Sequence, residues 1–119
     1  MKVPGPDHPI TITRSGSRVR VSFGGATIAE TTRALELKEA SYPAVFYIPR
    51  DDADMSALTK TGHHTHCPYK GDASYFSIAA GGRLAENAVW SYEAPFPAMA
   101  EIKEYLAFYP NRVDEIAVG

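Results

Sequence analysis

The residues best suited to chemistry lie in one short stretch, Thr65 to Gly71, which reads Thr-His-Cys-Pro-Tyr-Lys-Gly. Cys67 is the only cysteine of the 119-residue chain, and Lys70 follows it three residues later. A thiol is a nucleophile only as its thiolate, which nearby positive charge favours. Lysine suits phosphate or carboxylate as a point charge, and Gly71 lets a ligand approach the backbone. The stretch predicts an anion-binding site; the alternative is an enzyme with Cys67 as nucleophile or Lys70 as acid or base.

Aromatic side chains occur on both sides of this stretch, and a second cation, Arg50, precedes it. Tyrosine and tryptophan combine an apolar ring with a polar group, and such residues line many small-molecule sites. We therefore expect one shared cleft that binds an unknown small molecule with an anionic group. Its predicted ligand-binding residues are Tyr47, Arg50, Cys67, Lys70, Tyr75, Trp90 and Tyr92. The same aromatics also fit the core or rim of a sheet, and a lone cysteine is most often a small buried apolar residue. An interaction module without a pocket stays open as a third alternative.

Three histidines beside Cys67 resemble a metal cluster: His63, His64 and His66. Ligands in one short run rarely converge on a strand, whose side chains alternate, and tetrahedral sites usually draw on two separated pairs. A single cysteine also excludes an intramolecular disulfide. We predict no structural metal and no cofactor, and we interpret Thr61–His64 as a solvated loop. Binding is expected to depend more on Lys70 than on Cys67.

Composition and charge narrow the class of protein. The net charge is −2 and the pI about 6.0, so the basic excess of a nucleic-acid binder is missing and no nucleic-acid partner is expected. No run approaches the ~20 apolar residues that span a membrane. One cysteine suits a reducing cytoplasm, which is the expected location. Residues 1–119 fit one domain, and the oligomeric state is left open.

Alternation of apolar and polar residues predicts a mainly β fold, a compact antiparallel β domain with two short helices. The helices are expected near Ala53–Leu58, capped by an aspartate, and near Ala98–Tyr105, where apolar residues recur at helical spacing. Ile10–Thr13 and Val19–Phe23 read as a hairpin. Gly81-Gly82 is expected to turn the chain between the strands of Tyr75 and Trp90 and to make them neighbours.

Four segments in this order resemble the domain of unknown function family numbered 427: Tyr42–Asp52, Cys67–Tyr75, Ala88–Pro95 and Ile102–Tyr109. The resemblance covers nearly the whole chain and includes every predicted ligand-binding residue. It implies a β-rich domain with a tent-like pair of sheets, similar to folds that elsewhere bind zinc, although the several cysteines of such sites are missing here. The family also carries a nucleotidyltransferase-type label. Gly16-Ser17 lacks the acidic pair that would hold Mg²⁺ for that reaction.

Overall fold

The computed structural model describes residues 1–119 and consists of antiparallel strands joined by short turns. One sheet has the order β6-β7-β8-β9, with β6 Leu58–Cys67, β7 Gly71–Ala80, β8 Arg83–Ser91 and β9 Ala107–Phe108. A second has the order β1-β4-β5, with β1 Ile10–Arg14, β4 Leu35–Glu39 and β5 Val45–Tyr47. The third has the order β10-β2-β3, with β10 Glu115–Val118, β2 Val19–Phe23 and β3 Ala26–Thr31.

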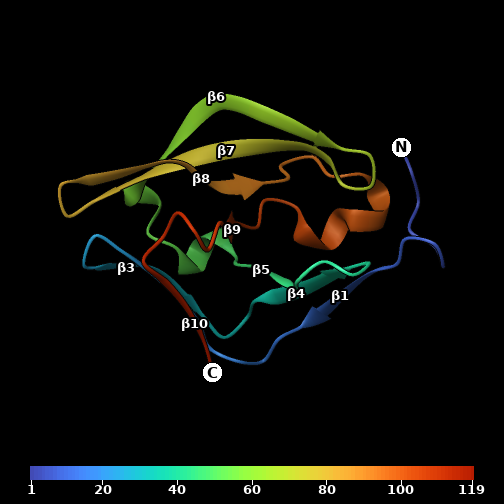
Figure 1. Cartoon of the computed structure of the whole chain (residues 1–119), viewed down its shortest axis with the longest axis horizontal. Coiled ribbons are helices and arrows are strands. Elements are labelled where there is room, and N and C mark those ends of the chain that lie inside the picture. The colour runs from blue at the N-terminus through green and yellow to red at the C-terminus, as the bar shows by residue number, and fades with distance from the viewer.

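The four-stranded sheet lies over the other two sheets in Figure 1. The predicted mainly β, antiparallel class is confirmed, with three sheets where the family resemblance implied a pair. None of the helical segments is long and apolar enough to cross a membrane. The three sheets meet over two cores. One is aliphatic and phenylalanine-rich, and the other contains most of the buried tyrosines.

The two predicted helices are single 3₁₀ turns instead. Residues 53–58 hold only η2 Met55–Ala57, preceded by η1 Arg50–Asp52, and β6 already begins at Leu58. Residues 98–105 hold η3 Pro97–Ile102, which is broken at Met99, whose φ and ψ are −112° and 19°. Helical segments this short gain little from their own hydrogen bonds, so tertiary contacts decide their geometry. Here Met99 and Ile102 reach the core from a kinked turn.

The predicted hairpin of Ile10–Thr13 with Val19–Phe23 is wrong. β1 pairs with β4, and both edges of β2 are occupied, one by β3 and the other by β10. Gly24 and Gly25 turn the chain between β2 and β3 with φ values of 61° and 78°, which favour a tight two-residue turn. The glycine pair therefore specifies the hairpin partner of β2 more strongly than the longer connection before it.

The prediction of a loop at Thr61–His64 is also wrong, because these residues lie within β6. The pairing of β6 with β7 shifts between Lys60 and His64. This irregularity turns the His63 ring onto Tyr75, with ring centroids 4.5 Å apart. The predicted turn at Gly81-Gly82 is confirmed, since it joins β7 to β8, which pair along their length.

Two glycine turns hold the sheets together at one end of the molecule. A Cβ at Gly24 would lie 2.3 Å from the carbonyl oxygen of Ala80, and one at Gly81 would lie 2.1 Å from the carbonyl oxygen of Gly24. Both glycines have positive φ. The tips of the β2–β3 and β7–β8 hairpins therefore touch backbone to backbone, and they lie next to each other at the left of Figure 1. The opposite end of the sheets carries the candidate site.

Candidate ligand cavity

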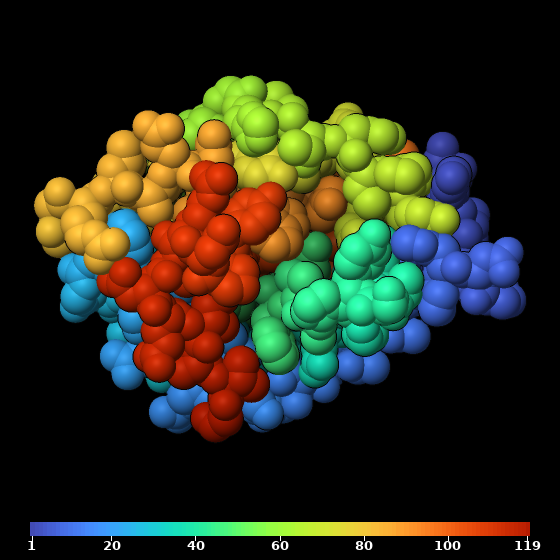
Figure 2. All heavy atoms as spheres, in the orientation of Figure 1, coloured from blue at the N-terminus to red at the C-terminus, as the bar shows by residue number.

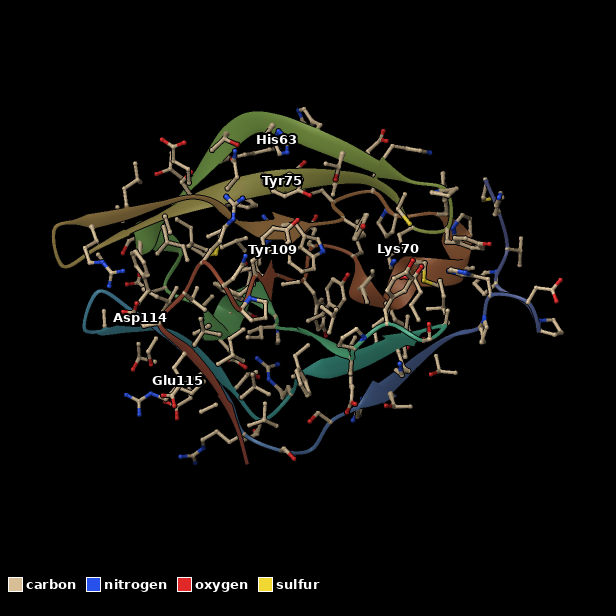
Figure 3. All side chains as sticks on the ribbon, in the orientation of Figure 1. His63, Lys70, Tyr75, Tyr109, Asp114 and Glu115 are labelled. Carbon is tan, nitrogen blue, oxygen red and sulfur yellow. The ribbon has the colours of Figure 1, made fainter.

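A cavity of about 280 Å³ opens between β4, β5, β7 and β8, and we call it the tyrosine cavity. Its walls include five of the seven predicted ligand-binding residues: Tyr47, Lys70, Tyr75, Trp90 and Tyr92. The two other predicted residues, Cys67 and Arg50, are not among its walls. Figure 3 shows Tyr75 and Tyr109 facing each other across the middle of the molecule, with Lys70 toward one end.

Strand register brings the aromatic walls together. Tyr75 of β7 is paired directly with Trp90 of β8, so their side chains emerge on the same face of the sheet. Tyr92 follows Trp90 by two residues and keeps to that face. Tyr47 comes from β5 in the sheet below. Sequence positions up to 45 residues apart thus converge because two sheets face each other here.

The aromatic rings support one another. Trp90 meets Tyr47 edge to face, with centroids 6.4 Å apart and planes at 87°, and its Nε1 donates to the Tyr47 hydroxyl at 3.3 Å. Trp90 also packs at 4.5 Å on Tyr109. The hydroxyls of Tyr109 and Tyr75 lie 3.2 Å apart, and that of Tyr75 bonds Thr65. Such contacts fix the ring orientations, so the cavity walls are formed in advance of any ligand.

Lys70 supplies the charged end of the cavity. It is 7% exposed, and its Nζ forms an ion pair with Glu39 Oε1 and lies 3.7 Å from Cys67 Sγ. Glu39 Oε2 is also 2.7 Å from His8 Nε2. Burial alone would raise the pKa of the Glu39 carboxyl, but the hydrogen bonds of Lys70 and His8 outweigh it and lower that pKa. The pair therefore stays charged inside the wall of the cavity.

The turn between β6 and β7 places Lys70. Gly71 has φ 111°, a conformation that favours glycine, and the Lys70 carbonyl accepts a hydrogen bond from the Phe96 N–H at 3.0 Å. The backbone on both sides of the lysine is thereby fixed. Its side chain runs to Glu39 and lines the cavity beside the aromatic rings.

Two tyrosine hydroxyls in the cavity have donor capacity that the protein leaves unused. Tyr92 is 7% exposed, and its hydroxyl has no hydrogen-bond partner in the protein. Tyr47 is fully buried; its oxygen accepts from Trp90, while its own O–H has no acceptor. Burial raises the pKa of both phenols well above the ordinary value, so both remain protonated donors at neutral pH. No side-chain nitrogen or oxygen atom is buried without a hydrogen-bond partner, and the two O–H groups are donors available to a molecule in the cavity.

Arg50 lies on the other face of β8. Its guanidinium donates to Ser91 Oγ at 3.1 Å and to Glu93 Oε2 at 3.0 Å, and it lies over the Phe76 ring. Ser91 and Glu93 alternate with Trp90 and Tyr92, so their side chains point away from the cavity. Arg50 therefore belongs to a polar network outside the tyrosine cavity.

Cys67 lies behind Lys70. It is half-buried and packs against the tyrosine-rich core. Its neighbour His66 points to the opposite face, where its Nδ1 lies 2.7 Å from Asp72 Oδ1. The thiol is not among the walls of the cavity, although the core against which it packs contains Tyr47, Tyr75 and Tyr92. No group of three or more histidine, cysteine, aspartate or glutamate side chains is arranged to hold a metal ion.

Sequence reasoning missed several wall residues. Glu39, Tyr42 and Tyr109 also line the cavity. Tyr109 ends the family-like segment Ile102–Tyr109, and that position was the available signal for it. Glu39 pairs with a lysine 31 residues away, a separation at which sequence spacing carries no information on contact.

The comparisons with known proteins agree with the resemblance noted from the sequence. The model of the domain of unknown function DUF427 family matches residues 11–119. No curated protein matches this chain.

Proposed function

The chain belongs to the DUF427 family, a domain of unknown function, and we propose that it binds a small anionic molecule in the tyrosine cavity. The anionic group, of the size of a carboxylate, accepts hydrogen bonds from Lys70 and from the hydroxyls of Tyr47 and Tyr92. The apolar part of the ligand packs against Trp90 and Tyr109. Arg50, on the opposite face of β8, takes no part in this binding.

The unused hydroxyls carry the proposal. Tyr47 and Tyr92 both have an O–H without an acceptor, and both line the cavity that also contains the Lys70 ammonium. An ammonium has three N–H donors, of which Glu39 uses one and the long contact to Cys67 Sγ a second, so one is left for a ligand. These groups offer donors and no spare acidic acceptor, so they select a ligand rich in acceptor oxygens. A carboxylate gains most, because hydrogen bonds to a charged group are the strong ones.

Charge balance limits the ligand to a small anion. Glu39 already neutralises Lys70, and His8 lies beside Glu39 on the side away from Lys70. A single carboxylate can share the ammonium with Glu39 when two phenols also donate to it. A group of several charges, such as a triphosphate, meets only one cation here. The cavity volume of about 280 Å³ is close to the lower limit for small-molecule sites, which suits a ligand of about one ring.

A matched pair of probes tests the proposal. Benzoate and benzamide have nearly the same shape and differ in charge, and calorimetry gives their affinities directly. We expect benzoate to bind more tightly. Tyr92→Phe keeps the ring and removes one donor, and it should weaken benzoate by about tenfold. Tyr105→Phe, a tyrosine outside the cavity, is the control and should change nothing. Equal affinity for the two probes, or binding of neither, would contradict the proposal.

A double variant is needed to test how much the charge of Lys70 contributes to binding. Lys70→Met alone leaves Glu39 without its main partner, so Lys70→Met combined with Glu39→Gln removes the pair and keeps the shape of the cavity. This variant should bind benzoate about tenfold to hundredfold more weakly than the wild type and benzamide about equally. Unchanged benzoate affinity would assign recognition to the phenols alone.

One observation favours a second candidate, an enzyme that uses Cys67. Lys70 Nζ lies 3.7 Å from Cys67 Sγ, and an adjacent ammonium stabilises a thiolate. An activated thiol would react with iodoacetamide at neutral pH far faster than a free cysteine. The binding proposal expects slow alkylation, because Cys67 packs behind Lys70 and outside the cavity.

A further inference from the structure

A second cavity, of about 260 Å³, lies beside the first, and every side chain that lines it is apolar. Its walls come from β2, β10, β5 and the segment after β9, and we call it the apolar cavity. Val19 and Val21 form its floor, and Ile116 and Val118 form one side. In Figure 2 the surface is hollowed between the red C-terminal segment and the green to teal residues of the β4–β5 region.

The two cavities are neighbours that share two walls, Val45 and Trp90. β5 and the residue after it separate them, because their side chains alternate: Phe46 and Ile48 line the apolar cavity, and Tyr47 lines the tyrosine cavity. β5 is the edge strand of its sheet. On its free side it is tied to the four-stranded sheet at Ile48 and Leu106, which exchange backbone hydrogen bonds. Before that bridge, Val45 is the residue of β5 that lines both cavities, as Trp90 of β8 does.

We propose that the ligand is amphipathic and occupies both cavities. Its carboxylate lies in the tyrosine cavity, and an unbranched apolar chain crosses the ridge of Val45 and Trp90 into the apolar cavity. This inference rests on the proposed function, since it takes the anionic end from there. It adds the class of ligand: a medium-chain carboxylic acid.

The chemistry of the walls argues for this occupant. Donors and charge gather at the Lys70 end of the tyrosine cavity, and the apolar cavity offers apolar side chains alone. A sugar or nucleotide would lose the hydration of its hydroxyls in such walls without gaining partners. An alkyl chain gains affinity of about fourfold for each methylene buried. The change from polar to apolar walls therefore matches a molecule whose own polarity changes from end to end.

A chain-length series is the direct test. Acetate, butyrate, hexanoate, octanoate and decanoate share a head group and differ in length. Trp90 is the only tryptophan and lines both cavities, so its fluorescence reports binding at the ridge. Affinity should rise by about fourfold for each methylene that enters the apolar cavity and level off when the cavity is full. Alkyltrimethylammonium ions of the same lengths should not show this rise.

Two variants test whether the alkyl chain of the ligand lies in the apolar cavity. Val118→Asp puts a charge at the side of the apolar cavity, where Val118 is 49% exposed, so the fold should survive. It should weaken decanoate at least tenfold and leave butyrate unchanged. Leu84→Asp is the control, since Leu84 is 62% exposed and lies outside both cavities. Ala44→Met is the independent second variant: it fills the apolar cavity from its exposed rim and should shorten the chain length at which affinity levels off.

The outcomes separate this inference from the proposed function. If benzoate and butyrate bind with dependence on Tyr92 but longer chains gain nothing, the apolar cavity does not belong to the site and the inference fails alone. If chain length raises affinity but neither Tyr92→Phe nor the Lys70–Glu39 double variant matters, the head group lies elsewhere and both fail. A chain-length gain that Val118→Asp and Ala44→Met abolish, with Leu84→Asp neutral, supports the inference.

Discussion

Lys70 and Arg50 are the two cations predicted for one cleft, and the structure separates them by the thickness of a sheet. Lys70 lines the tyrosine cavity and pairs with Glu39. Arg50 pairs with Glu93 on the opposite face of β8. The separation follows from the alternation of side chains along a strand. Trp90 and Tyr92 point into the cavity, so the residues that alternate with them point away. These are Ser91 and Glu93, which Arg50 contacts. The charge of a residue says less about its place in a site than the face on which the residue lies.

The two ion pairs also differ in the partners that the carboxylate would keep if its cation were removed. Glu93 has a second partner, since Lys60 Nζ donates to it at 2.7 Å. Glu39 would keep only His8. Lys70 is nearly buried, and Arg50 is about a quarter exposed. The same type of ion pair is therefore a sensitive element in one region and a redundant one in the other.

The largest effect on stability is expected for Lys70→Met. It leaves the Glu39 carboxylate in a buried wall with one weaker partner, and breaking a buried pair in this way costs about 3–5 kcal/mol. Urea unfolding measures the loss in the free energy of unfolding. The double variant Lys70→Met with Glu39→Gln should recover most of it, because no charge is left unpaired. A double variant as unstable as the single one would show that packing, not charge, sets the cost.

Arg50→Met should cost less, about 1.5–3 kcal/mol, which is the range for hydrogen bonds to a charged group. The variant loses the bonds of Arg50 to Glu93, to Ser91 and to the Glu104 carbonyl, but Lys60 still pairs with Glu93. Benzoate affinity should not change, in contrast to the Lys70–Glu39 double variant. Weaker benzoate binding by a folded Arg50→Met protein would return Arg50 to the site.

Low pH should reduce the stability of the fold in the Arg50 region by protonating Glu93. Burial would raise the pKa of Glu93, but hydrogen bonds from Lys60, Arg50 and Ser74 lower it to about 2. A carboxyl whose pKa is depressed in the folded state stabilises it above the unfolded pKa of about 4.3, and this contribution is lost as the pH falls toward 2. Glu93→Gln should therefore flatten the fall in stability over this window. Glu101→Gln, at an exposed glutamate, controls for the loss of one carboxylate, and equal acid profiles for both variants would refute the assignment.

Alternation of apolar and polar residues predicted the mainly β class, but it did not predict β6, whose residues Thr61–His64 were interpreted as a loop. The pairing of Tyr75 with Trp90 followed from the turn at Gly81-Gly82. The local sequence did not predict the pairing partner of β1, because β1 pairs with β4, a strand that is not its neighbour in the chain. The same limit hid Glu39: its contact with Lys70 depends on how two sheets pack, and no local pattern encodes that. Arg50 was predicted from its charge and from the family-like segment Tyr42–Asp52, and neither signal shows which face of β8 it contacts.

The smallest effect is expected for Cys67→Ser. The thiol packs against the tyrosine-rich core, is not among the walls of the cavity, and lies 3.7 Å from Lys70 Nζ. Serine is nearly isosteric, and its hydroxyl can accept from the same ammonium, so stability should change by about 1 kcal/mol or less. Benzoate affinity should stay within about twofold, while the Lys70–Glu39 double variant loses about tenfold or more. The two proteins are measured side by side by calorimetry. If the cysteine variant loses binding and the double variant keeps it, recognition runs through the thiol, and the enzyme with Cys67 as nucleophile becomes the better account of this cavity.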